Sequence, residues 1–463
     1  MGTVVGGKDV GTNPKKEKRQ WIYAKKPGGK LFNYRQWVGY SLLLFLFIAP
    51  FIKINGNPFV MFNIIERKFS IFGSVFYPQD LHIFVFGMLI MMVGIVLFTA
   101  VYGRVWCGWT CPQTIFMELV FRRIEYFIEG DWIQQRRLNE GPDSDARAWK
   151  KVLKHAIFLI ISFFISNIFL AYIIGVDALF KIMTDPVDQH IIGFASIILF
   201  TLAFYAVFAH VREIVCTTLC PYGRLQGVLL DEKSLTVAYD INRGEPRGKL
   251  KNDDTTQGDC IDCRLCVHVC PTGIDIREGT QLECVNCTAC IDACDTVMDK
   301  IGRPKRLIGF YSMDDLSEEG KAGKKNNTRA IAYSAILVVL TFIFGALLFN
   351  RAEIDGRLLR AKGSSYQFRE DGTVSNLYTL ELLNKSGKDI SFEIQSVDNE
   401  IDVQMVNHIQ GLKKEGNATL SFFLIMDKSN ISEYKQDVKV NIVSDGKIME
   451  TLKTTFIAPP NKK

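Results

Sequence analysis

Two cysteine-rich stretches, CIDCRLCVHVCP at residues 260–271 and CVNCTACIDAC at residues 284–294, decide the fold in the middle of this chain. Each follows the pattern C-x2-C-x2-C-x3-C, which is typical of loops that hold a [4Fe–4S] cluster. Closely spaced thiolates reach three iron corners from one tight loop, and the fourth cysteine of each run serves the other cluster. We therefore predict one cluster on Cys260, Cys263, Cys266 and Cys294, and a second on Cys284, Cys287, Cys290 and Cys270.

Zinc and disulfide bonds are the alternative interpretations of these eight cysteines. A structural zinc ion takes four ligands, usually as two separated pairs, whereas this chain repeats a triplet plus one. Disulfides need an oxidising compartment, which the topology described below argues against. One departure from the ferredoxin pattern is Asp295, which follows Cys294 where Pro271 follows Cys270. Because proline supplies no ligand, this departure affects the shape of the loop and leaves the ligand set unchanged.

Five apolar stretches are long enough, and poor enough in charge, to be membrane-spanning helices. Pro50 interrupts the first of them near its end, so we expect a kink there. A chain of 463 residues has room for about three domains. The predicted spans cover residues 37–54, 82–102, 153–175, 191–210 and 330–349.

Lysine and arginine alternate between rich and poor segments along these spans. They are frequent before the first span and between the second and third spans. They are sparse in the loop between the first and second spans and in the loop between the third and fourth. The positive-inside rule then places the N-terminus and both cysteine runs in the cytoplasm and the C-terminus outside. The basic N-terminal segment is better explained by this rule than as a nucleic-acid-binding arm, and it lacks the pattern of a signal peptide. We expect a multi-pass membrane protein that binds no nucleic acid.

The other four cysteines form two shorter motifs, CGWTCP at residues 107–112 and CTTLCP at residues 216–221. Each motif follows a hairpin of two spans, which predicts two parallel repeats in the membrane core. Cysteines at i and i+4 share a helix face, and two such faces brought together would present four thiols to one soft ion. Thiolates select Cu(I), zinc or iron–sulfur, so a copper or electron-relay site is one interpretation, and reduced structural thiols beside proline turns are the other. The four residues are Cys107, Cys111, Cys216 and Cys220.

The segment after Pro112 has apolar residues at helical spacing from Ile115 to Ile128. This pattern predicts an amphipathic helix, with its charged residues outside the apolar face, that lies in the cytoplasmic membrane interface or docks on the ferredoxin-like domain. Two histidines, His155 and His210, are expected at the inner membrane edge with their hydrogen bonds satisfied. No glycine-rich dinucleotide motif supports a flavin or nicotinamide site. The charged residues of the amphipathic helix are Arg122, Arg123, Glu125 and Glu129.

From about residue 354 the sequence changes to short alternating segments separated by turns, which predicts a β-sandwich. Residues 420–426 form a continuous apolar run that suits a buried strand, and Asp445-Gly446 suits a tight turn. The alternating apolar positions are Ile390, Phe392, Ile394, Val438, Val440 and Ile442.

In combination, these parts closely resemble the cbb(3)-type cytochrome c oxidase accessory protein family, known as CcoG, FixG or RdxA. The resemblance rests on CGWTCP, on CTTLCPYGR at residues 216–224, on the double cysteine run and on CDTVMDKIGRP at residues 294–304. It implies a location in the bacterial inner membrane, two [4Fe–4S] clusters, an immunoglobulin-like C-terminal domain and reduction of Cu(II) to Cu(I) for copper delivery during oxidase assembly. The implied enzyme is a cupric reductase. It would interact with oxidase assembly factors, with copper-transporting membrane proteins and with an electron donor that the sequence does not name.

The expected architecture is an α-helical transmembrane bundle with a ferredoxin-like two-cluster domain and an all-β immunoglobulin-like sandwich. A quinol-dehydrogenase-type respiratory module, a non-enzymatic oxidase assembly scaffold and a redox sensor are the other functions that fit the same sequence. The expected parts are a basic cytoplasmic segment at 1–36, a four-span core with both CxxxCP motifs at 37–225, the cytoplasmic cluster domain at 226–329, a fifth span at 330–349 and a periplasmic sandwich at 350–463.

Overall fold

The computed structural model describes residues 21–459, apart from 55, 250–256, 318–327, 362–365, 387, 407–410, 415, 432 and 445. Its residues divide into two compact units, which are described one after the other. The first unit is Met1–Phe47, Val93–Asn167 and Val187–Ser334, and the second is Ile48–Met92, Ile168–Pro186 and Ala335–Lys463.

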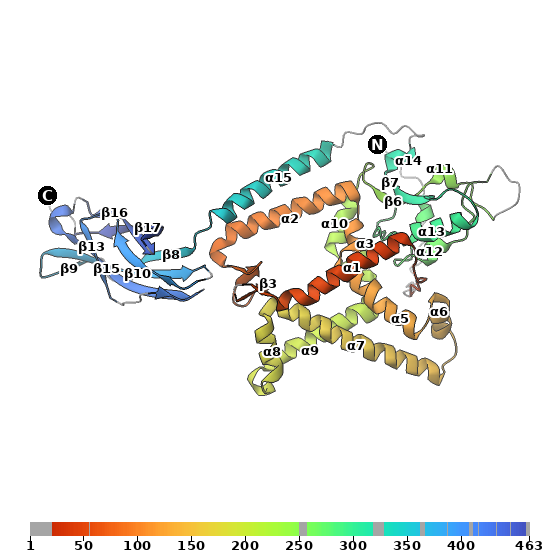
Figure 1. The fold of residues 1–463 in the computed structure, drawn as a ribbon, viewed down its shortest axis with the longest axis horizontal. Helices are drawn as coiled ribbons and strands as arrows, with labels where there is room; N and C mark the ends of the chain where they lie inside the picture. The colour runs from red at the N-terminus through yellow and green to blue at the C-terminus, as the bar shows by residue number, and fades with distance from the viewer. Residues whose placement is uncertain are drawn as a thin grey trace, which may run out of the picture. The chain divides into compact units, whose positions relative to one another are not determined.

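Four helices are long and apolar enough to cross a membrane (Figure 1). They match four of the five predicted spans, and the chain is a membrane protein. The first predicted span, 37–54, falls on α1 (Lys30–Ile48) and on a 3-10 turn, Ala49–Phe51, that contains Pro50. Helix α1 is less apolar than the other four, and its crossing of the membrane stays a prediction. The four helices are α2 (Leu81–Tyr102), α7 (Asp145–Ile174), α9 (Ile191–Ala206) with a π-helical extension (Val207–Val211), and α15 (Thr328–Phe349).

Short helices of the first unit start at the prolines of the two CxxxCP motifs. Pro112 and Pro221 each occupy the first helical turn, where a missing backbone N–H costs nothing. Two π-helical segments, Phe116–Phe121 and Val215–Leu219, interrupt the regular helix near the motifs. The short helices are α3 (Val105–Trp109), α4 (Pro112–Ile115), α5 (Arg122–Ile128), α6 (Trp132–Glu140) and α10 (Pro221–Leu229).

Two short strands that pair antiparallel flank the two cysteine runs in the sequence: β6 (Thr236–Tyr239) and β7 (Ile308–Tyr311). This pairing brings the chain before the first run against the chain after the second, so the loops between them fold back on one core. Ile291, Met298 and Leu307 are almost completely buried in that core. The helical pieces here are α11 (Ile241–Gly244), α12 (Leu265–His268), a 3-10 turn (Ile276–Glu278), α13 (Ala289–Lys300) and α14 (Met313–Ser317).

The second unit contains a group of short strands between α1 and α2 that the sequence did not reveal. Arg351 and Lys385 both donate to Asp80 at 2.8 Å, which ties this segment to the chain after α15. Helix α15 lies alongside α2, since a Cβ on Gly87 would lie 3.5 Å from the ring of Phe344. The remaining elements are β1 (Lys53–Ile54), β2 (Asn57–Pro58), β3 (Val60–Asn63), β4 (Lys68–Ile71), β5 (Ser74–Phe76), a 3-10 turn (Pro78–Asp80), α8 (Val176–Thr184) and, in the first unit, a 3-10 turn (Val187–Gln189).

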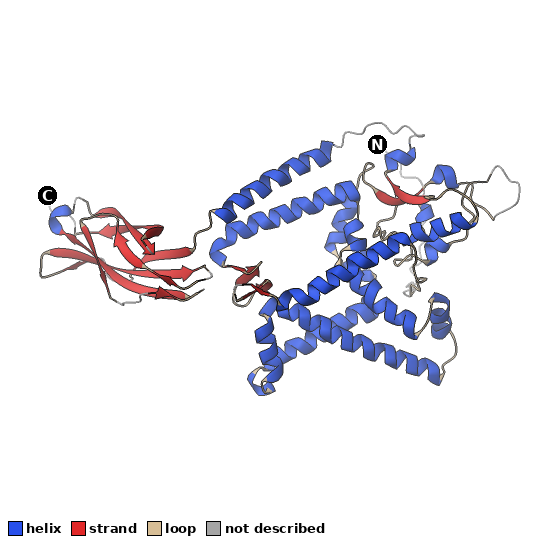
Figure 2. Ribbon diagram, in the orientation of Figure 1, coloured by secondary structure: helices blue, strands red, loops and turns tan. Residues whose placement is uncertain are grey.

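The C-terminal part is all-β, as predicted (Figure 2). One antiparallel sheet has the order β13-β15-β10-β8 with β9 beside β10, a second has β12-β16-β17, and β11 pairs with β14. The predicted buried run lies on β15, where alternate side chains from Leu420 to Met426 are buried, and Val440 and Ile442 on β16 are fully buried. Gly446 has φ +76 in the β16–β17 turn, while Asp445 lies outside the described residues. The strands are β8 (Ile354–Arg360), β9 (Gln367–Phe368), β10 (Thr373–Asn384), β11 (Ile390–Ser391), β12 (Glu393–Ser396), β13 (Ile401–Met405), β14 (Gly411–Leu412), β15 (Asn417–Asp427), β16 (Lys435–Ser444) and β17 (Lys447–Ile457), with a 3-10 turn at Lys428–Asn430.

Candidate functional site

The two cysteine runs share an unusual backbone conformation. Asp262 and Arg264 have φ of 50° and 54° in the first run, and Asn286 and Thr288 have 52° and 64° at the equivalent positions of the second. A left-handed residue that is not glycine costs of order 1 kcal/mol or more, and such strain is concentrated at functional sites. The same turn therefore occurs twice, and each copy points its cysteines into a cavity.

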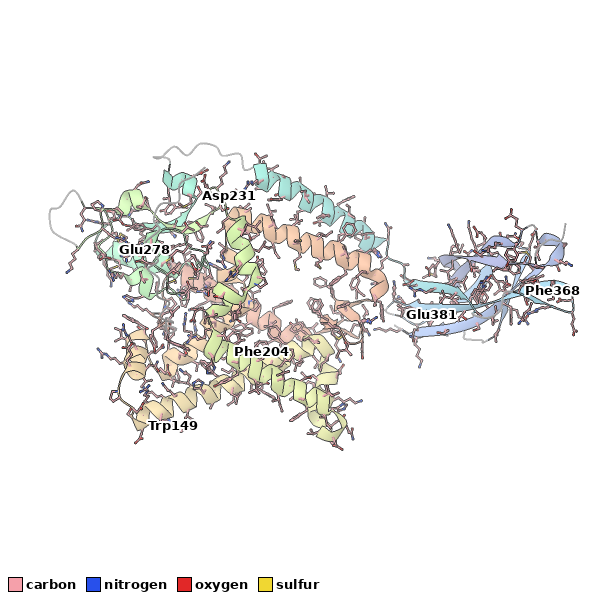
Figure 3. The ribbon with its side chains drawn as sticks, turned by 180° about the vertical axis from the view of Figure 1, so that it is seen from behind. Trp149, Phe204, Asp231, Glu278, Phe368 and Glu381 are labelled. Carbon is pink, nitrogen blue, oxygen red and sulfur yellow. The ribbon has the colours of Figure 1, made fainter. Side chains whose placement is uncertain are left out.

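The first cavity is small and is lined by four cysteines. Tyr239 and Arg277 also line it, and Glu278, the neighbour of Arg277, marks this region in Figure 3. Cys263 is exposed, whereas Cys260 and Cys266 are buried. The four cysteines are those predicted to share a cluster, namely Cys260, Cys263, Cys266 and Cys294.

The second cavity is lined by the other predicted set, Cys270, Cys284, Cys287 and Cys290. Cys266 lines this cavity as well as the first, so the two sites adjoin. Each cavity thus takes its fourth cysteine from the opposite run. All twelve cysteines lie among the described residues and none forms a disulfide.

The donor set fits a polynuclear iron–sulfur group better than a single ion. Among the described residues, no three cysteine, histidine or carboxylate side chains are arranged to hold one metal ion. Thiols spread around a cavity suit a cluster with several irons, whereas a structural zinc needs four ligands within about 2.3 Å of one point. Burial raises the pKa of Cys266, Cys284 and Cys294 to about 12, so these thiols are neutral until a bound cation ionises them.

The four remaining thiols lie near one another in the first unit. Cys107 is in α3, Cys216 is in the π-helical segment Val215–Leu219, and Cys111 and Cys220 each cap the helix that starts at the next residue. Burial raises the pKa of Cys216 to about 12, and the three other thiols are close enough to contribute to that rise. The Cys107 thiol donates to Gln226 Oε1 at 2.9 Å. The fold therefore brings the two CxxxCP motifs together, as predicted. In the part of the chain that the structure describes, the four thiols are not arranged to hold a single metal ion.

The CxxxCP motif at Cys107 packs directly against the second cysteine run. A Cβ on Gly108 would lie 2.4 Å from the carbonyl oxygen of Val285 and 2.9 Å from the backbone of Cys287. Cys107 and Cys287 share one buried apolar cluster, with Cys216 and Cys290 packed against it. The thiol quartet and the second cavity are therefore neighbours, with no intervening layer of protein at this point.

Replacing Gly108 with alanine should destabilise the protein by about 1–3 kcal/mol, because the new methyl group meets backbone atoms that cannot rotate away. Thermal unfolding in detergent measures this loss. Gly94→Ala is the matched control, since a Cβ there meets nothing within 4 Å. Equal stability of the two variants would contradict the close packing.

Three of the four charged residues predicted to lie outside the apolar face of the segment after Pro112 are buried, at 2% to 4% exposure: Arg122, Glu125 and Glu129. Arg122 donates to the carbonyl of Pro271 at 3.4 Å, which fits docking of this helix on the cluster domain, and it pairs with Glu118 of the same segment at 2.5 Å. The other two partners come from elsewhere in the chain: Arg212 binds both oxygens of Glu125 at 3.0 and 2.9 Å, and Lys154 reaches Glu129 at 2.7 Å. Helical periodicity in one segment could not reveal these partners.

The inner-edge histidines lie together. Tyr205 Oη is 2.9 Å from Nδ1 of His155, and the rings of His155 and His210 stack with centroids 6.2 Å apart. Phe204, labelled in Figure 3, belongs to the same helix α9 as Tyr205. The hydrogen bond at His155 matches the expectation of a satisfied histidine.

Four long apolar helices and two cysteine-lined cavities define a membrane-bound iron–sulfur protein. A sequence model of the 4Fe-4S dicluster domain matches residues 211–313, a 4Fe-4S binding domain matches 84–137, and the IG-like fold at the C-terminal of FixG matches 344–459. The chain is 34% identical to Protein RdxB of Cereibacter sphaeroides over 413 residues, which are 86% of each chain.

Two further relatives point the same way. Protein RdxA of Cereibacter sphaeroides is 34% identical over 81% of each chain. Nitrogen fixation protein FixG of Rhizobium meliloti is 33% identical over 80% of this chain and 78% of its own. The chain belongs to the FixG/RdxA family, as the motifs predicted, and is an iron–sulfur electron-transfer protein.

Proposed function

We propose that this protein reduces Cu(II) to Cu(I) at the inner membrane, for copper delivery during assembly of a cbb(3)-type cytochrome c oxidase. Its partners are oxidase assembly factors, copper-transporting membrane proteins and a low-potential one-electron donor. The observation that carries the proposal is that Cys107 and Cys287 belong to one buried apolar cluster, with Cys216 and Cys290 packed against it. This contact gives electrons a short route from the second cavity to four soft ligands.

The residues that hold the resident cofactors are the two sets of four cysteines that line the cavities. When bound there, [4Fe–4S] clusters supply single electrons. The substrate Cu(II) takes one such electron to become Cu(I). Thiolates favour Cu(I), so Cys107, Cys111, Cys216 and Cys220 stabilise the product of the reduction over its substrate. Copper would draw these thiols closer together and displace their protons.

The proposed topology has five spans, with α1 as the first, and two parallel hairpin repeats. It is supported by the distribution of lysine and arginine and by the equivalent placement of Cys111 and Cys220 before a helix that starts with proline. In this arrangement the N-terminus and both cavities are cytoplasmic, and the β-domain is periplasmic.

Substituting all four cysteines of the quartet by serine should abolish copper reduction and leave the iron content unchanged. The assay follows Cu(I) formation by anaerobic, dithionite-reduced protein with a Cu(I)-specific chromophore. Thr218→Ser is the matched control, because Thr218 lies between Cys216 and Cys220 and is exposed. We expect at least a hundredfold loss of rate in the quadruple variant and full activity in the control.

Unchanged copper reduction in the quadruple variant would overturn the copper site. A quinol-dehydrogenase-type module would instead oxidise a quinol analogue with loss of visible cluster absorbance. A scaffold would support oxidase assembly even after the cavity cysteines are replaced.

A further inference from the structure

The two cavities differ in the charge that surrounds them. Beside the first cavity, the buried guanidinium of Arg277 is neutralised by two carboxylates. Its Nε and one Nη bind Asp275 at 2.8 and 2.6 Å, and the other Nη binds Asp262 at 2.5 Å. Arg264, which is more exposed, also lies 3.8 Å from Asp262, so two negative charges balance two positive charges at this site.

Beside the second cavity, two buried guanidinium groups donate to carbonyl oxygens, and Arg104 also hydrogen-bonds the Cys107 thiol. Arg35 is 2% exposed, and its Nε donates to the carbonyl of Gly108 at 2.7 Å. Arg104 is 3% exposed and donates to the carbonyl of Leu282, two residues before Cys284. Within the described parts of the chain neither arginine pairs with a carboxylate, and Glu118, whose charge also acts on Cys287, is paired with Arg122 at 2.5 Å.

Helix α1 holds Arg35 in this position. Asp292 accepts hydrogen bonds from the backbone N–H groups of Leu31 and Phe32, at 3.2 and 2.7 Å, and so caps the start of the helix. Asp292 itself lies on α13 between Cys290 and Cys294. Arg35 follows one turn later and reaches Gly108, which touches the backbone of Cys287. The Arg35 guanidinium is therefore held by backbone contacts next to Cys287 of the second cavity and next to the CGWTCP motif of the thiol quartet.

A positive charge close to a redox centre favours the reduced form, and charges in the protein interior are weakly screened. Burial by itself disfavours added negative charge, but both cavities have buried cysteines. The net neighbouring charge is what differs between the two cavities: it is positive at the second cavity and is not positive at the first. The first cavity also has the exposed Cys263, where a donor can approach.

We propose that Arg35 and Arg104 set the direction of electron transfer by making the second cavity the site of higher reduction potential. One electron leaves the cofactor held at the first cavity, which is oxidised, and reduces the cofactor held at the second, with no transfer of atoms. A low-potential one-electron donor then reduces the first again. The inference rests on the proposed function only in requiring two clusters, and it holds whether or not copper is the final acceptor.

The test is an anaerobic redox titration of the full-length protein in detergent, followed by EPR and without copper. Wild type should show two couples, and Cys263→Ala should remove the lower one, because Cys263 lines the first cavity alone. Arg35→Gln should lower the reduction potential of the upper couple by at least about 59 mV and leave the lower couple in place. This shift corresponds to a tenfold change in the equilibrium constant of a one-electron step. Arg35→Lys should restore most of the loss, which a purely structural role of the side chain would not allow.

Arg277→Gln is the matched control at the other site, and it should lower the reduction potential of the lower couple. If Arg35→Gln does not retain iron, Arg104→Gln provides the same measurement, with the same expected shift of the upper couple. The proposal is overturned if the couple removed by Cys263→Ala is the upper one, if both couples coincide in wild type, or if the arginine variants leave the upper couple unmoved. Ordered couples in a protein that fails to reduce copper would refute the copper role alone.

Discussion

Replacing Cys294 with serine should remove the iron held by Cys260, Cys263 and Cys266, although Cys294 belongs to the other cysteine run. The reason is the lining of the first cavity, which takes its fourth cysteine from α13, the helix that carries the end of the second cysteine run. Iron content should fall from about eight atoms per chain to about four, since each [4Fe–4S] cluster holds four. The remaining EPR signal should be the one that also survives Cys260→Ser.

Thr296→Ala is the control for this substitution, because Thr296 lies on the same helix and is exposed. It should keep the full iron content. If Cys294→Ser instead abolishes the signal that Cys284→Ser abolishes, each run would hold its own cluster, and the crosswise assignment would be wrong.

Replacing Arg212 with glutamine should destabilise the protein by about 3–5 kcal/mol, because Glu125 would be left as a buried charge without its bidentate partner. Both side chains are 5% exposed, so water cannot replace the lost hydrogen bonds. Lys154 is 3.9 Å from Glu125 and already serves Glu129, so it compensates poorly. Thermal unfolding in detergent, followed by circular dichroism, measures the loss.

The control is Arg136→Gln, which breaks an ion pair with Glu140 in which both side chains are about 60% exposed. Exposed pairs of this kind contribute about 0.2–1 kcal/mol, so this variant should be nearly as stable as wild type. Adding Glu125→Gln to Arg212→Gln should recover part of the stability, because the unpaired charge is removed with its partner. Equal losses in Arg212→Gln and Arg136→Gln would show that the buried pair has no special role.

The cysteine spacing was enough to predict which thiols share a cavity, because a C-x2-C-x2-C loop determines the positions of its three thiols within one turn of chain. The two αL residues in each loop were not foreseen, although Asp262 and Asn286 are residue types that tolerate that conformation. The β-domain was also predictable, since the alternation of Val438, Val440 and Ile442 is the period of a strand with one buried face.

The amphipathic helix shows where such reasoning failed. Its apolar face was predicted to lie in the membrane interface or on the cluster domain; Ile115, Phe116 and Leu119 are buried, whereas Phe127 is 91% exposed. Three of its four charged residues are also buried, because α7 and the turn after α9 cover them with Lys154 and Arg212. Periodicity reports the polarity of a helix face, and it carries no information about a partner a hundred residues away.

By itself, the sequence determined the family, the two cysteine sets, the four most apolar helices and the all-β domain, since each of these follows from spacing or periodicity within a short stretch of chain. Only the tertiary structure decided that Gly108 packs one thiol motif on Cys287, that Asp292 caps α1, and that Arg35 donates to Gly108 beside the second cavity. Those contacts join residues up to 261 positions apart, and burial there excludes water. The charge on an arginine is evident from its sequence, but the low-dielectric surroundings that make this charge effective exist only in the folded chain.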